Sequence, residues 1–131
     1  METFRLYWRI VRFWQAWRVI TTPDIHWLTV PELVEILGIG VSKVRRLIED
    51  RSLLAIRVDG VLKVPAKFIR DGEPISELKG TLVVLTDNGF SDEEAMHWLL
   101  TQDDNLDASP IDALLTGRKA EVRRVAQALA F

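Results

Sequence analysis

Residues 28–69, LTVPELVEILGIGVSKVRRLIEDRSLLAIRVDGVLKVPAKFI, decide the fold. The first part of this stretch predicts a short helix. Thr29 and Glu32 have the spacing of a capping box, and Pro31 stands in the first helical turn. Gly38 follows the last apolar position, as expected at the end of a helix.

A second short helix is predicted directly after the Gly38-Ile39-Gly40 corner. Apolar residues repeat there at helical spacing from Val41 to Ile48. Two short helices joined by a tight glycine turn indicate a helix-turn-helix, and the second is the recognition helix. Arginine can pair with guanine edges or phosphates, whereas lysine and serine more often hold the DNA backbone. With the apolar stripe turned toward the first helix, the outer surface carries Ser42, Lys43, Arg45 and Arg46.

A β-hairpin is predicted next, because Asp59-Gly60 separates two β-branched runs at residues 54–58 and 61–64. Beside a helix-turn-helix, such a hairpin would form a wing. Two basic residues lie on its strands, and two more lie on a short helix expected after Pro65. These four side chains are expected to reach flanking phosphates: Arg57, Lys63, Lys67 and Arg70.

Charge is distributed unevenly along the chain, although the net charge is only −2. Residues 41–70 contain eight basic and three acidic residues, whereas residues 71–115 contain one lysine and eleven acidic residues. A basic module followed by an acidic one predicts that only the first meets a polyanion.

Each local feature also has an ordinary explanation, because basic residues often form only a solvated helix face. Their order along the chain favours binding of double-stranded DNA. The competing interpretation is a protein-interaction module, either antitoxin-like or an adaptor, that uses the winged fold and the carboxy-terminal helices.

The acidic carboxy-terminal part is predicted to be helical, which makes the whole protein mainly α with a small β-hairpin wing. Helices are expected at residues 74–88, after a capping box at Ser91, and at residues 110–115 and 119–130. We expect this domain to serve a structural role or to form a homodimer. Binding of a protein partner by its helices is an alternative.

Residues 1–27 form an extension rich in tryptophan and arginine. An amphipathic helix here suits packing on the protein, docking on a partner, or lying at a membrane surface. Because arginines interrupt every apolar run, a spanning segment and a secretory signal both fit poorly, and we do not expect membrane contact.

No catalytic or metal site is predicted. The chain has no cysteine, and its two histidines, His26 and His97, stand far apart without a second ligand at metal spacing. Phosphate-cradling glycine motifs and nucleophile elbows are also missing. We therefore expect no enzymatic activity, cofactor or metal. The DNA-binding interpretation predicts a cytoplasmic transcriptional regulator or nucleoid-associated protein.

Three stretches carry a family resemblance: VSKVRRLIEDRSLLAIRV, DNGFSDEEAMHWLL and PIDALLTGRKAEVRRVAQALAF. From Leu28 onward, the chain resembles small actinobacterial DNA-binding regulators with a winged helix-turn-helix of the MerR/excisionase type and a helical carboxy-terminal domain. We expect a division into the amino-terminal extension (residues 1–27), the winged helix-turn-helix domain (residues 28–71) and the helical carboxy-terminal domain (residues 72–131). The resemblance implies DNA binding, without catalysis, through the wing and Ser42, Lys43, Arg45 and Arg46. The tryptophan-rich start does not match the polar tail expected in that family.

Overall fold

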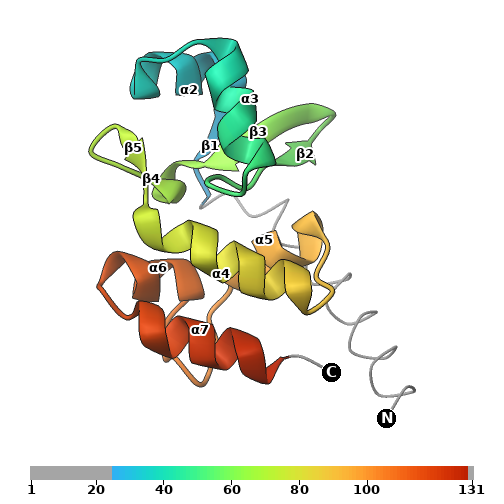
Figure 1. Ribbon diagram of the computed structural model, residues 1–131, viewed down its shortest axis with the longest axis vertical. Coiled ribbons are helices and arrows are strands. Elements are labelled where there is room, and N and C mark those ends of the chain that lie inside the picture. The colour runs from blue at the N-terminus through green and yellow to red at the C-terminus, as the bar shows by residue number, and fades with distance from the viewer. Residues whose placement is uncertain (1–24, 130–131) are drawn as a thin grey trace.

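The computed structural model describes residues 25–129, which form two tiers (Figure 1). The first tier holds a small sheet with two helices, and the second holds four helices. The elements of the first tier are β1 (Trp27–Thr29), α2 (Val30–Leu37), α3 (Val41–Glu49), β2 (Ile56–Val58), β3 (Val61–Pro65), the 3-10 helix η1 (Ala66–Phe68), β4 (Ile69–Arg70) and β5 (Glu73–Pro74). The second tier consists of α4 (Ser76–Asp87), α5 (Asp92–Leu100), α6 (Pro110–Leu115) and α7 (Lys119–Ala128).

Helices α2 and α3 form the predicted helix-turn-helix. The capping box of α2 is present, because Glu32 N donates to Thr29 Oγ1 (3.4 Å) and Thr29 N donates to Glu32 Oε1 (3.0 Å). At the other end, Gly38 has φ +66°, which glycine adopts without steric cost, and donates its N–H to Val34 O (3.0 Å). The α2–α3 corner is thus defined by local backbone chemistry.

The predicted wing is the β2–β3 hairpin. Its turn residues Asp59 and Gly60 have φ +53° and +80°, as a type I′ turn requires. The sheet also has a strand that the sequence analysis missed, since β1 pairs antiparallel with β3 and aligns Leu28 with Val64. A three-residue strand directly before a helix is too short to show alternation. The first tier therefore begins at Trp27.

The segment after β3 differs from the prediction of a helix carrying Lys67 and Arg70. Only the single turn η1 forms, and Lys67 lies in it. Arg70 lies in β4, which pairs with β5 around Asp71 (φ +56°) and Gly72 (φ +75°). Two consecutive left-handed residues cannot continue a helix, so the chain reverses here, and α4 begins only after Pro74.

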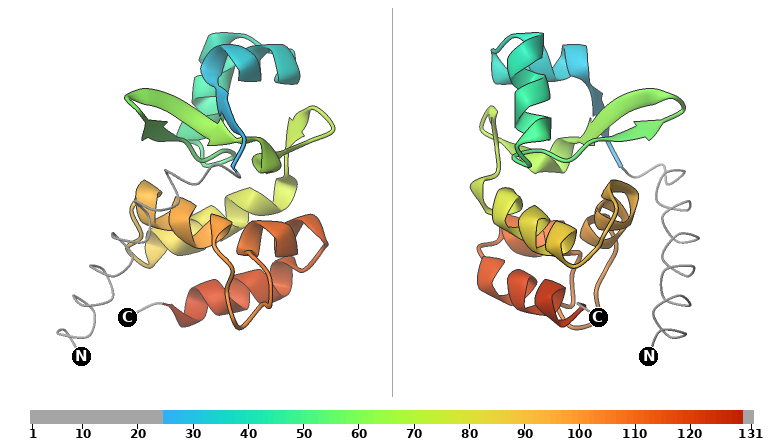
Figure 2. Two further views of the ribbon diagram at one scale, coloured as in Figure 1. Left: turned by 180° about the vertical axis from the view of Figure 1, so that it is seen from behind. Right: turned by 45° about the vertical axis from the view of Figure 1, so that its right-hand side comes forward.

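The second tier contains the four predicted helices, and α4 and α7 lie side by side (Figures 1 and 2). Ser91 caps α5 in a capping box with Glu94, and Ser109 caps α6. Between α4 and α7, the Arg123 side chain crosses Gly80, where any Cβ would collide with the guanidinium. A side chain at this position would displace the Arg123 guanidinium from its place over α4.

One hydrophobic core connects the tiers. Its fully buried members include Val44 of α3, Phe68 of η1, Leu78 of α4 and Leu114 of α6. A hydrogen bond from Ile75 N to Phe68 O (2.9 Å) adds a backbone link between the N-cap of α4 and η1. This shared packing fixes the recognition helix relative to the carboxy-terminal helices.

Candidate nucleic-acid interface

Helix α3 separates an apolar face from a basic face. Val44 is fully buried against the first tier, with Leu47 and Ile48 half-buried beside it. The opposite face is exposed and carries Ser42, Lys43, Arg45 and Arg46. Within residues 25–129, none of the three cations on this face forms an ion pair. The structure therefore leaves these charges available to an external anion.

The end of α3 is negatively charged. Asp50 follows the helix and accepts a hydrogen bond from Ser52 N (3.0 Å) at Oδ1. Hydrogen bonding by Ser52 lowers the pKa of Asp50, and the positive charges of Lys79 and Arg46 lower it further. Positive charge on α3 is thus concentrated in its first two turns, where helix-turn-helix proteins contact base edges.

The wing carries its two basic residues on different faces. Strand register aligns Arg57 with Leu62 and Lys63 with Ile56, so Arg57 and Lys63 point to opposite sides of the ribbon. Arg57 is exposed beside the turn and donates from Nη1 to Gly60 O (3.2 Å). Lys63 is half-buried and lies close enough to lower the pKa of Glu32. The two side chains therefore cannot contact the same phosphate.

Other cations of the first tier lie at the junction between the tiers. Lys67 Nζ forms an ion pair with Asp112 Oδ1 at 2.9 Å. The Arg70 guanidinium lies 3.7 Å from a Glu77 carboxylate oxygen. Lys67 and Arg70, which the sequence analysis grouped with the wing, thus both pair with acidic residues of the second tier.

Arg51 is the least exposed of the three junction cations, with 28% of its side chain exposed. It donates to Asp92 Oδ1 (2.8 Å) and to Thr86 Oγ1 (3.0 Å), so it links the end of α3 to both α4 and α5. Part of the acidic charge of the carboxy-terminal helices therefore serves to hold the basic module in place.

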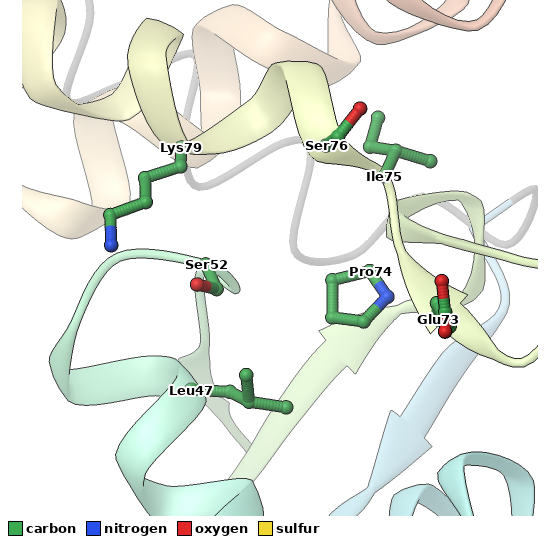
Figure 3. Close-up of a pocket in the computed structure, with 7 residues that line it drawn as sticks. All are labelled: Leu47, Ser52, Glu73, Pro74, Ile75, Ser76 and Lys79. Atoms are coloured by element: carbon green, nitrogen blue, oxygen red, sulfur yellow. The ribbon is translucent and has the colours of Figure 1, made fainter.

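A shallow pocket of about 320 Å³ lies where the end of α3 faces β5 and the start of α4 (Figure 3). Leu47 lines one side, and Lys79 extends from α4 toward the loop at Ser52. Lys79 is the single basic residue within residues 71–115. Its position beside the recognition helix was not predicted, because it depends on packing between the tiers rather than on local sequence.

Two family profiles match the chain. One, described as "DNA-binding protein Rv2175c, wHTH domain", matches residues 18–69, and the other, "Rv2175c C-terminal domain of unknown function", matches residues 75–130. The "DNA-binding protein Rv2175c" of Mycobacterium tuberculosis (strain ATCC 25618 / H37Rv) is 34% identical over 125 residues, which cover 86% of each chain. This chain belongs to the Rv2175c family.

A solved structure confirms the architecture of this Rv2175c-family chain. The NMR structure of Rv2175c matches with a TM-score of 0.77 and 35% identity, and the match covers 84% of each chain. An excisionase of Streptomyces ambofaciens is 46% identical over 50 residues, or 38% of this chain and 77% of the excisionase. The predicted winged helix-turn-helix with a helical carboxy-terminal domain is confirmed, as is the resemblance to a DNA-binding family.

Residues 25–129 bring no three His, Cys, Asp or Glu side chains together as a metal-binding group. No helix in the same range has the length and apolar character needed to cross a membrane. The predicted extension at residues 1–27 lies outside the described residues, except for Ile25, His26 and Trp27.

Proposed function

We propose that this protein binds duplex DNA and acts as a transcriptional regulator or nucleoid-associated factor. The observation that carries the proposal is that some cations of the first tier form ion pairs within the protein, whereas those on α3 do not. Arg51, Lys67 and Arg70 pair with acidic residues of the second tier. In contrast, the α3 cations are exposed and, within residues 25–129, unpaired. A polyanion is the complementary partner for such a face.

In this proposal, the outer face of α3 enters the major groove. Arg45 and Arg46 have the donor geometry to read guanine O6 and N7, while Ser42 and Lys43 hold the flanking backbone. The wing contributes Arg57 and Lys63 to phosphates on either side of the ribbon. Among the residues predicted from sequence, Lys67 contributes least to DNA binding, because Asp112 already neutralises its charge.

Two copies of the chain are proposed to bind two half-sites. A single small module buries too little surface for tight specific binding, and helix-turn-helix proteins commonly solve this by dimerising. In this proposal, the carboxy-terminal helices provide the dimer contact or bind a protein partner.

A salt-titrated mobility-shift assay tests the proposal, using duplexes selected from a random pool. We expect affinity to fall steeply as salt rises, because each neutralised phosphate releases counterions. Arg45→Ala should cost about 1–3 kcal/mol and relax the base preference at one position. The matched control is Arg124→Ala, which removes an exposed arginine from α7, outside the groove-facing surface, and should leave the base preference unchanged.

Salt-independent association, or Arg45→Ala and Arg46→Ala variants that bind DNA like the parent, would contradict the groove assignment. That result would favour the alternative of a protein-interaction module built from the winged fold and the carboxy-terminal helices.

A further inference from the structure

Large apolar side chains are strongly exposed at four places in residues 25–129. Three of the four lie on the winged helix-turn-helix, although that tier is only part of the described chain. Val41 opens the recognition helix, and Val61 directly follows the wing turn. The four residues are Ile36, Val41, Val61 and Val83, with 45%, 48%, 48% and 43% of their surface exposed.

Val41 is the single strongly exposed apolar side chain on α3, which is fully described. It lies one helical turn before Arg45, so the two side chains occupy neighbouring places on the same side of the helix. Val44, three residues later, points into the core and is fully buried. By the same spacing Val41 also neighbours Val44, so with 48% of its surface exposed it lies at the border between the packed face and the residues proposed to enter the groove.

The residue before Val41 leaves the tip of α3 bare. Gly40 is the N-cap of α3, and its φ of −75° and ψ of 165° are ordinary extended values that any residue adopts. A Cβ built on Gly40 meets nothing within 4 Å. Neither backbone strain nor packing within the protein therefore accounts for glycine here. A bare tip does suit close approach of the helix start to an external surface.

We infer that Val41 determines part of the DNA specificity by contacting the C5 methyl group of a thymine. This inference rests on the proposed function. Thymine methyl is the apolar group that the major groove presents, and small apolar side chains recognise it. With Arg45 one turn away, the thymine would lie within a few base pairs of a guanine read by that arginine.

The test replaces each thymine of the selected duplex, one at a time, by deoxyuridine, which lacks only the C5 methyl group. For the parent protein, we expect one such replacement to weaken binding about three- to ten-fold, the effect of losing one buried methyl contact. Val41→Ser should weaken binding to the thymine duplex by a similar factor and remove the difference between thymine and uracil. Val41→Thr, which retains one methyl group, should keep part of that difference.

Val83→Ser is the matched control, because Val83 is about as exposed as Val41 but lies on α4. It should preserve the full difference between thymine and uracil. Tight, salt-dependent binding of the parent that no uracil replacement weakens would overturn the role of Val41 while leaving DNA binding intact. A Val41→Ser protein that still distinguishes thymine from uracil would overturn it equally. Failure to bind any duplex would instead contradict the proposed function itself.

Discussion

Two glycines at the α2–α3 corner have different physical roles. Gly38 has φ +66°, a left-handed conformation that costs other residues free energy, so the fold itself requires glycine there. Gly40 has ordinary backbone angles and open space around its α-carbon. Stability therefore explains the first glycine, and the proposed approach to DNA explains the second.

Gly40→Asp should stabilise the fold and weaken DNA binding. An aspartate N-cap accepts hydrogen bonds from the first amides of α3 and should add a few tenths of a kcal/mol to the free energy of unfolding. The same carboxylate would stand beside the groove and repel phosphates. Urea denaturation and a mobility-shift assay measure the two effects. Gly38→Ala, the control, should destabilise by about 1 kcal/mol or more. Unchanged or tighter DNA binding by Gly40→Asp would argue against the bare tip as a DNA contact.

Thr29→Ala should destabilise the protein by about 1 kcal/mol near neutral pH, because the N-cap of α2 is lost. Hydrogen bonds from the Thr29 backbone and side chain lower the pKa of Glu32 below its ordinary value of 4.5. The ionised carboxylate therefore stabilises the fold fully above about pH 4.5, and this contribution is lost as pH falls through the lowered pKa.

Urea denaturation at pH values from 7 down to about 3 measures this effect. The difference in unfolding free energy between the parent and Thr29→Ala should shrink as the pH falls. Ser109→Ala is the control, because Ser109 caps α6 by accepting from the Asp112 amide. The loss of unfolding free energy caused by Ser109→Ala should change less with pH. Because the backbone N–H of residue 29 still donates to Glu32 in this variant, a Thr29→Ala difference that stays constant across this range would contradict the part of the pKa lowering assigned to the Thr29 side chain.

At the scale of elements, the sequence predicted features that depend on neighbouring residues better than features that depend on contacts between distant segments. The capping boxes at Thr29 and Ser91 and the Asp59-Gly60 turn each depend on a few neighbouring residues, and all three are present. Strand β1 was missed because its pairing with β3 is distant in sequence. Exposure of the basic face of α3 followed from helical periodicity. The pairing of Lys67 with Asp112 did not, since it depends on how η1 meets α6.

Arg57→Ala and Lys67→Ala should therefore differ in their effect on DNA binding. Removal of the exposed wing arginine should lower the slope of log affinity against log salt by about one ion. Removal of Lys67 should change that slope little, because Asp112 already neutralises it. Equal reductions in slope for both variants would show that Lys67 leaves Asp112 to bind phosphate.

At the scale of the whole molecule, a shared hydrophobic core makes the two tiers one cooperative unit. Leu114 is 1% exposed in α6, and Val44 is fully buried in α3, within the same core. Charge pairs at exposed positions contribute only about 0–1 kcal/mol each. Apolar packing, rather than the junction ion pairs, should therefore dominate the coupling between the tiers.

Leu114→Ala should destabilise both tiers together, by about 2–5 kcal/mol. Amide hydrogen exchange should show the loss of protection at Val44 as well as in α4, because both report global unfolding. Val83→Ala, a truncation at an exposed site, should change stability by less than about 0.5 kcal/mol. If Val44 kept its protection in Leu114→Ala, the tiers would unfold independently.

The orientation of α3 as a DNA-reading helix is tested most directly by an NMR titration of the full chain with a selected duplex. The account predicts that amide shifts and line broadening concentrate at residues 40–46 and around the wing turn at residues 57–61, and that they weaken as salt is added. Changes concentrated on α6 and α7, with the amides of α3 unaffected, would contradict it.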